Sequence, residues 1–138
     1  MLLNFICDRL AEAFCEKLHL DIRKNHWGYS KDENLKLDEL LKGKYKGIRP
    51  AVGYPSIKDQ KEILKIFEIL HGDENTGVVV TESYMMNPPF SVCGLYFANE
   101  NAKYFDVYKI DENQIKDYAI RDRENLEELK IRLPYILK

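Results

Sequence analysis

The sequence of 138 residues lacks several patterns that would point to common classes of function. No stretch can span a bilayer, because the longest apolar segment, residues 6–20, is interrupted by charged side chains. Acidic and basic residues nearly balance, at 23 and 21, so the net charge of -2 gives no electrostatic reason to expect nucleic-acid or anionic-membrane partners. The first residues do not follow the pattern of a signal peptide, and no glycine-rich loop for nucleotides or phosphate is present.

Cysteine and histidine are scarce, and neither has the spacing of a metal site. No close cysteine pair and no cysteine–histidine cluster matches a zinc motif. The odd cysteine count and the missing secretion signal favour a cytoplasmic location with free thiols. The three cysteines are interpreted as small apolar fillers: Cys7, Cys15 and Cys93. The three histidines are interpreted as surface residues near helix ends: His19, His26 and His71.

The hydrophobic content of 45% is enough for the core of a single domain over residues 1–138. Apolar residues at steps of three and four predict a long helix over 2–24. Further helices are predicted over 35–41, 57–71, 112–122 and 125–133. Ser56 is the predicted cap of the third helix. Predicted strands cover 78–81, 90–98 and 104–110, with the last two paired antiparallel through a hairpin at 99–101. This order indicates an α+β fold, an antiparallel β-sheet flanked by helices.

The most irregular stretch contains the segment Arg49-Pro50-Ala51-Val52-Gly53-Tyr54-Pro55. Its glycines and prolines predict a loop, because proline fixes the backbone and glycine permits tight turns. An arginine in such a loop can clamp an anion, since the guanidinium fork fits a carboxylate with two parallel hydrogen bonds. Taken alone, the segment is also typical of a surface loop with a solvated arginine.

Two further segments have both a structural and a functional interpretation. Residues 81–88 carry polar side chains and a methionine pair, which can line a pocket or form a core strand running into a turn. The aromatic residues of 94–97 and 103–105 are typical of sheet packing. They can alternatively form a stacking wall for a flat or cationic ligand.

Read in order, these segments resemble one known family, whose most specific signature corresponds to Gly47-Ile48-Arg49-Pro50-Ala51-Val52-Gly53-Tyr54-Pro55. Other segments follow in the family's order and spacing over nearly the whole chain: Asp8–Phe14, Trp27–Tyr29, Glu33–Leu35, Thr76–Gly77, Thr81–Ser83, Ser91–Phe97, Lys103–Phe105 and Gln114–Ala119. By this resemblance the chain is identified as a member of the activation domain family of cobalamin-dependent methionine synthase.

The resemblance implies a role in methionine biosynthesis, as part of a cobalamin-dependent methyltransferase. The activation domain of this family binds S-adenosylmethionine and supports the reductive methylation of cob(II)alamin to methylcobalamin. The implied partners are the cobalamin-binding domain, which holds the cobalamin, and a flavodoxin-type electron donor. No general base is needed, since cob(I)alamin is itself the nucleophile. The resemblance therefore implies no catalytic and no metal-binding residue in this segment.

The resemblance also implies which residues meet the cofactor: Arg49, Tyr104 and Phe105, with Ala51, Gly53 and Tyr54 beside Arg49 in the loop. Arg49 is expected to hold the methionyl carboxylate, while the tyrosines present ring faces or hydroxyl groups. The family's activation domain is longer than this chain, which is expected to be its C-terminal portion. The absent N-terminal portion is expected to supply the acidic residue that binds the amino group.

Two other functions stand against this interpretation. The chain can be an interaction module that binds no ligand and docks on a cobalamin-binding partner. Asp8 and Glu12, one helical turn apart, are a candidate docking edge for such a module, although they also suit a solvated helix face. An unrelated stand-alone methyltransferase is disfavoured, because no Rossmann-type glycine loop is present.

Overall fold

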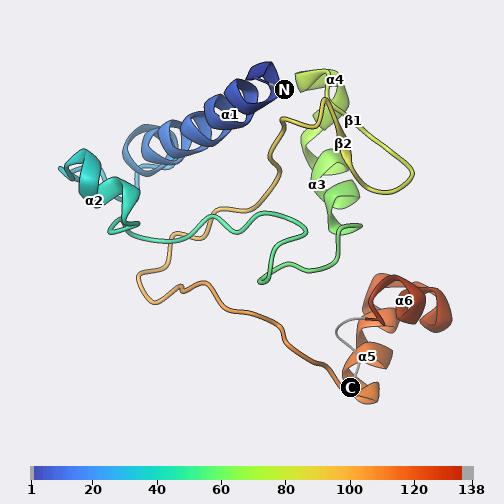
Figure 1. Cartoon of the computed structure of the whole chain (residues 1–138). Helices are drawn as coiled ribbons and strands as arrows, with labels where there is room; N and C mark the ends of the chain where they lie inside the picture. Colours follow the sequence, from blue (N-terminus) through green and yellow to red (C-terminus); the bar gives the residue numbers. More distant parts are fainter. Residues whose placement is uncertain (1, 135–138) are drawn as a thin grey trace.

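The computed structural model describes residues 2–134 and contains helices joined by long irregular segments (Figure 1). Helix α1 (Leu2–Asp21) continues into a π-helical turn, η1 (Ile22–His26), and is followed by α2 (Leu37–Leu41). Next come α3 (Glu62–Leu70), α4 (Gly72–Thr76) and the antiparallel strands β1 (Val79–Val80) and β2 (Met86–Asn87). The last elements are α5 (Glu112–Asp122) and α6 (Leu126–Arg132). This arrangement confirms the predicted α+β class, although the sheet that the described residues form has two strands.

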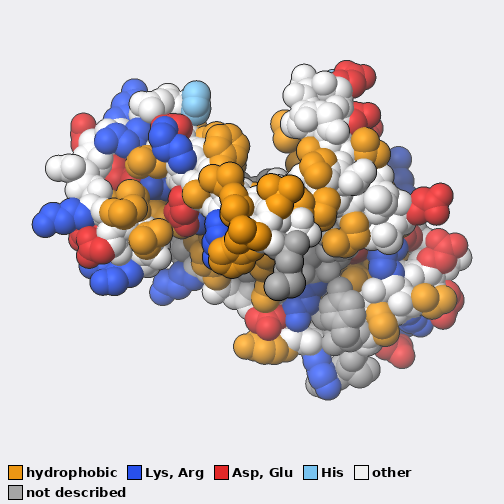
Figure 2. Space-filling model, turned by 45° about the horizontal axis from the view of Figure 1, so that its top comes forward, with side chains coloured by type: hydrophobic (Ala, Val, Ile, Leu, Met, Phe, Trp, Pro, Cys, Tyr) orange, Lys and Arg blue, Asp and Glu red, His pale blue; other side chains and the backbone are white. Residues whose placement is uncertain are grey.

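The first helix has the predicted extent but not the predicted environment. It spans residues 2–24 as expected and reaches residue 26 through η1. Its fully buried residues are polar, namely His19 in α1 and Arg23 in η1. Hydrophobic side chains gather at the surface instead, beside a hollow on the face shown in Figure 2. The exposed fractions on the predicted apolar face are large: Leu3 71%, Leu10 64% and Phe14 64%.

The third predicted helix begins later than the sequence indicates. Ser56 does not cap it, because the Ser56 hydroxyl donates to the Phe105 carbonyl oxygen at 2.6 Å and accepts from the Phe105 N–H at 3.2 Å. Helix α3 therefore begins at Glu62 rather than at residue 57, and it ends at Leu70. The predicted stop residue, Gly72, opens α4.

The predicted hairpin between residues 90–98 and 104–110 is wrong. The first of these segments pairs with the loop of residues 48–52 through two isolated antiparallel bridges, Ile48 with Phe97 and Ala51 with Gly94. Pro50 lies between the bridges and has no N–H group to donate, so a regular ladder cannot form there. The remaining predicted strand, 78–81, is present as β1 and pairs with β2.

The apolar core lies between the last two helices, which begin close to where the sequence predicts. Asp111 Oδ1 accepts from the N–H groups of Asn113 and Gln114 at 2.8 and 2.9 Å. The Gln114 side chain accepts from the Asp111 N–H in return, which completes a capping box for α5. Asn125 caps α6 by accepting from backbone N–H groups in the same way. Four buried side chains form the core cluster: Ile115, Ala119, Leu129 and Leu133.

All three cysteines are free, as predicted. Burial raises the pKa of the Cys15 and Cys93 thiols. Within residues 2–134, no helix combines the length and the apolar character that crossing a membrane requires. The limits of the predicted domain, residue 1 and residues 135–138, lie outside the described part of the chain.

Candidate functional site

The loop of residues 49–56 is held by two segments from later in the chain. Its first half is bridged to the segment that contains Gly94, where a Cβ would lie only 2.5 Å from the Pro50 carbonyl oxygen. Glycine is therefore required for this close approach. The second half of the loop meets Val107, whose N–H donates to the Pro55 carbonyl at 3.2 Å. The two segments that were expected to pair with each other each bind this loop instead.

The guanidinium group of Arg49 is held by side chains from α1 and from the turn before the loop. Its Nη1 and Nη2 atoms donate to the two carboxylate oxygens of Glu16, the first at 3.1 Å. Nη1 also donates to the Tyr45 hydroxyl at 2.9 Å and lies 3.2 Å from Nδ1 of His19. Burial acts to lower the pKa of Arg49, but the hydrogen bonds with Glu16 and the nearby Tyr45 raise it overall.

His19 is fully buried, which corrects its interpretation as a surface histidine. Burial, followed by the charges of Arg23 and Arg49, lowers the pKa of His19 to about 3, so the ring is neutral near pH 7. A guanidinium group can only donate, and Nδ1 must therefore accept from Arg49. The ring proton is then on Nε2, which lies 3.1 Å from the Tyr29 hydroxyl. The other two histidines of the chain are exposed, as predicted.

A second arginine, in η1, supports the same cluster. The Arg23 side chain is 1% exposed, and its Nε and Nη2 atoms donate to the Glu33 carboxylate at 2.7 Å each. Its Cζ lies 4.1 Å from the centroid of the Tyr45 ring, so the cation packs against the aromatic side chain. The Cζ of Arg49 lies 5.7 Å from the same centroid. Tyr45 therefore contacts both arginines and connects them.

Most of the predicted cofactor residues come together along one groove of about 1520 Å³. Gly53 is not among the residues that line this groove, and its role is to permit the turn of the backbone in the loop. Its φ is 84°, and a Cβ there would lie 2.2 Å from the side-chain oxygen of Gln60. The predicted residues that line the groove are Arg49, Ala51, Tyr54, Tyr104 and Phe105.

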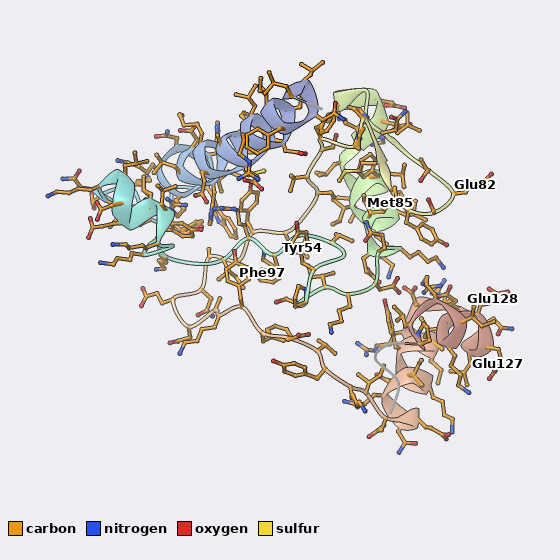
Figure 3. The ribbon with its side chains drawn as sticks, viewed as in Figure 1. Tyr54, Glu82, Met85, Phe97, Glu127 and Glu128 are labelled. Atoms are coloured by element: carbon orange, nitrogen blue, oxygen red, sulfur yellow. The ribbon has the colours of Figure 1, made fainter. Side chains whose placement is uncertain are left out.

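The aromatic side chains predicted to contact the cofactor are largely exposed. The exposed fractions are 66% for Tyr54, 60% for Phe105 and 57% for Tyr104. The Tyr104 hydroxyl accepts from the backbone N–H of Arg49 at 3.0 Å, which ties its segment to the loop. Tyr54 lies near the middle of the molecule (Figure 3). These rings are therefore accessible to a ligand in the groove.

Residues 81–88 do not form the core strand that the sequence allowed, and one of them lines the groove. Residues 81–85 connect β1 to β2, and the Thr81 N–H donates to the Met85 carbonyl at 2.8 Å. Glu82 lies at the outer end of this connection, away from Tyr54 (Figure 3). Within the segment, Met86 is the residue that lines the groove.

The sequence pattern alone does not indicate the side chains that hold Arg49. Glu16 and His19 lie three residues apart on α1, and Arg23 follows four residues later. This polar stripe has the same helical spacing as the apolar stripe that was interpreted as the core face. The signal for these side chains is a row of polar residues at helical spacing, on the face of α1 opposite its exposed apolar residues.

The arrangement can bind an anion next to aromatic surfaces. Arg49 places a cation in the groove wall, and the exposed rings offer faces for a flat or cationic group. Within residues 2–134, no three His, Cys, Asp or Glu side chains are grouped to hold a metal ion. The site therefore suits a ligand that carries both a carboxylate and a planar ring.

Comparisons with known proteins identify the family of the chain. Residues 1–123 match the family described as vitamin B12 dependent methionine synthase, activation domain. The chain is also similar to a crystal structure of the MetH reactivation domain bound to AdoHcy, with 44% sequence identity and a TM-score of 0.92. That match covers 94% of this chain and 40% of the other, so the present chain spans less than half of its relative. The chain belongs to the family of vitamin B12-dependent methionine synthase activation domains.

Proposed function

We propose that this chain is the C-terminal part of an activation domain and binds S-adenosylmethionine in the groove beside Arg49. In this role it supports the reductive methylation of cob(II)alamin to methylcobalamin, as part of the methyltransferase methionine synthase. The observation that carries the proposal is that Arg49, Tyr54 and Tyr104 line one groove. They do so in a chain 44% identical to a reactivation domain that holds AdoHcy.

The side chains along the groove suit the separate parts of S-adenosylmethionine. The Arg49 guanidinium group fits the carboxylate of the methionyl moiety. The exposed rings of Tyr54, Tyr104 and Phe105 can stack on the adenine or face the sulfonium cation. The backbone of residues 51–54 borders the same space and is proposed to meet the adenosine.

In this proposal the chain contributes position rather than bond-breaking groups. When bound, S-adenosylmethionine supplies the methyl group that restores methylcobalamin. The side chains along the groove hold it in one orientation, which is the larger part of what such a site has to provide. No base from this chain is needed, because the thioether leaves without a proton. The proposed partners are the cobalamin-binding domain, which holds the cobalamin, and a flavodoxin-type donor of the reducing electron.

We further propose that the rest of the activation domain covers the open side of the groove. The groove volume of about 1520 Å³ exceeds the range of roughly 300–1000 Å³ that is common for small-molecule sites. Leu10 and Phe14 on α1 are each 64% exposed, and apolar surface of this kind marks an interface. The matched relative is longer, since the match covers 40% of its chain. The covering part is proposed to supply the acidic residue for the ligand's amino group.

Calorimetric titration of S-adenosylmethionine into the full chain tests the proposed ligand. Arg49→Ala should weaken binding by at least tenfold, because it removes a charge-assisted pair of hydrogen bonds. Arg121→Ala is the matched control, since Arg121 lies on α5 with its side chain 71% exposed and paired with Asp117. Equal affinities of the wild type and Arg49→Ala would contradict the clamp.

The alternative of an interaction module without a ligand is not favoured, because the relative holds AdoHcy. Asp8 and Glu12, its candidate docking edge, are exposed, and the Glu12 carboxylate lies 2.9 Å from Nη1 of Arg9. These contacts are those of a solvated helix face. Capture by a cobalamin-binding partner, measured with and without S-adenosylmethionine, separates the two functions. If the chain is only an interaction module, its capture by the partner should not depend on S-adenosylmethionine.

A further inference from the structure

The hydrogen bonds of Arg49 fill one edge of its guanidinium group and leave the other open. An arginine can pair with a carboxylate through its end edge, Nη1 and Nη2, or through its side edge, Nε and Nη2. In Arg49 the end edge is taken by Glu16, and Nη1 also faces Tyr45 and His19. Within residues 2–134, no group accepts a hydrogen bond from Nε of Arg49. The side edge is thus available on a side chain that is 22% exposed and lines the groove.

The neighbours of Arg49 determine which edge remains open. Glu16 comes from α1 and binds both terminal nitrogens, so it opposes rotation of the guanidinium group. His19 is a neutral, fully buried acceptor on the same helix, and the Tyr45 hydroxyl accepts from Nη1 on the same side. We propose that Glu16, supported by His19 and Tyr45, is a positioning residue that presents the Nε and Nη2 edge of Arg49 to the ligand carboxylate. This inference rests on the proposed function, in which Arg49 binds that carboxylate.

Positioning of this kind should strengthen binding in two ways. A free arginine side chain loses considerable rotamer entropy when it is fixed, and here α1 fixes Arg49 before a ligand arrives. A carboxylate already on the end edge also prevents a ligand from pairing there. The ligand carboxylate can then bind Arg49 only through the side edge, so one orientation is selected over the other.

A comparison of two ligands separates positioning of Arg49 from other roles of Glu16. S-adenosylmethionine and decarboxylated S-adenosylmethionine share the adenosine, the sulfonium and the amino group, but only the first has a carboxylate. Glu16→Gln keeps the size of the side chain and removes its charge. In the full chain we expect it to weaken S-adenosylmethionine binding about tenfold and to change binding of the decarboxylated compound less than twofold.

Asp21→Asn is the matched control for this experiment. Asp21 is also an acid on α1, its side chain is 28% exposed against 34% for Glu16, and it pairs with Lys17 rather than with an arginine of the groove. It should change neither affinity. Once Arg49 has been replaced by alanine, Glu16→Gln should have no additional effect on S-adenosylmethionine binding, because its effect passes through Arg49.

The outcomes distinguish failure of this inference from failure of the proposed function. If Glu16→Gln weakens both ligands equally, Glu16 contacts the cationic part of the ligand or supports the fold, and the positioning role is wrong. If it weakens neither ligand while Arg49→Ala abolishes binding, the proposed function stands and the inference is overturned. If Arg49→Ala binds as tightly as the wild type, the proposed function itself fails.

A measurement without ligand tests the same inference if the chain alone binds neither compound. Nitrogen-15 NMR of the guanidinium group, assigned by its loss in Arg49→Lys, reports rotation about the Cζ–Nη bonds. We expect slow rotation in the wild type and in Asp21→Asn, and at least tenfold faster rotation in Glu16→Gln. Fast rotation in the wild type would overturn the inference whatever the affinities are.

Discussion

Arg49 and Arg132 occupy similar surroundings but differ in how completely they are satisfied. Their side chains are 22% and 16% exposed, and each binds a carboxylate through its end edge. Arg132 also binds Asp59 through its side edge, with Nε and Nη2 donating at 3.0 and 2.9 Å. Its end edge donates to Glu124 at 2.5 and 2.6 Å. Both edges of Arg132 are therefore filled from within the chain, whereas Arg49 has one edge filled.

The difference separates an arginine that stabilises the fold from one that is available to a ligand. Arg132 connects α6 to Asp59, which is 5% exposed and precedes α3, so it joins parts of the chain that are far apart in sequence. Its pKa is raised by Glu124 first, and the pKa of Glu124 is in turn lowered to about 2, chiefly by the hydrogen bond with Arg132. Because both edges of its guanidinium group donate to carboxylates of the chain, Arg132 has no free edge for a ligand carboxylate.

The largest expected effect is on stability, from Arg132→Ala. Removing Arg132 leaves the buried carboxylate of Asp59 without its cation, and a broken buried ion pair destabilises a protein by about 3–5 kcal/mol. Urea denaturation of the variant and of Arg121→Ala gives the difference in the free energy of unfolding. Under conditions where the variant is folded, its affinity for S-adenosylmethionine should match that of the wild type. A loss of affinity as large as that of Arg49→Ala would break the comparison.

The pH dependence of stability should differ between the two regions. The pKa of His19 is lowered from 6.5 to about 3, so the unfolded chain takes up a proton that the folded chain does not. The contribution of His19 to the free energy of unfolding is complete above about pH 6.5. It is lost as the pH falls, by at most about 1.4 kcal/mol per pH unit. The lowered pKa of Glu124 acts in the same direction, but only below its ordinary value of 4.5.

His19→Asn tests this separation of the two pH windows. Asparagine can still offer an acceptor to Arg49 but does not titrate, so the slope between pH 6.5 and 4.5 should become shallower than in the wild type. Thermal denaturation over a pH series measures this slope. Glu124→Gln, from the other region, should leave the slope above pH 4.5 unchanged and reduce it below. An unchanged upper slope in His19→Asn would contradict the neutral, buried state of the ring.

Elements determined by local contacts could be predicted from the sequence, whereas those determined by distant contacts could not. The start of α5 follows from Asp111 and Gln114, which cap the helix within one turn. The predicted start of α3 was wrong because the Ser56 hydroxyl bonds to Phe105, 49 residues away, instead of capping a helix. The prediction of a hairpin was also wrong because of distant contacts, since both of its segments bind the loop that contains Pro50.

The same distinction between local and distant contacts applies to the residues of the candidate site. Arg49 and Tyr104 could be predicted because they belong to short segments that resemble a family. The residues that orient Arg49 could not, since Glu16 and His19 lie 33 and 30 positions before it and contact it only in the fold. The sequence pattern does not indicate these two residues, because α1 also carries an apolar stripe at the same spacing, which predicts the core face.

Arg49→Lys should have a smaller effect than the loss of Arg132 and should fall on binding instead of stability. Lysine keeps the positive charge but cannot form two parallel hydrogen bonds, so one edge can no longer hold Glu16 while the other holds a ligand. We expect the affinity for S-adenosylmethionine to fall about tenfold, or about 1.4 kcal/mol, and the free energy of unfolding to change by less than about 1 kcal/mol. Calorimetry and urea denaturation measure the two quantities. A variant that binds as tightly as the wild type would show that charge alone suffices.

The smallest expected effect comes from Tyr104→Phe, which removes a hydroxyl and keeps the ring. The backbone N–H of Arg49 donates to this hydroxyl at 3.0 Å, and a hydrogen bond of this kind contributes about 0.5–1.5 kcal/mol. Because the ring that faces the groove is unchanged, affinity for S-adenosylmethionine should fall by less than about fivefold. Tyr118→Phe is the counterpart near Arg132, where the hydroxyl lies 2.8 Å from both Asp59 and Glu62. It should lower stability more and leave affinity unchanged, because its partners are the buried Asp59 carboxylate and the partly buried Glu62 carboxylate instead of the loop beside the groove.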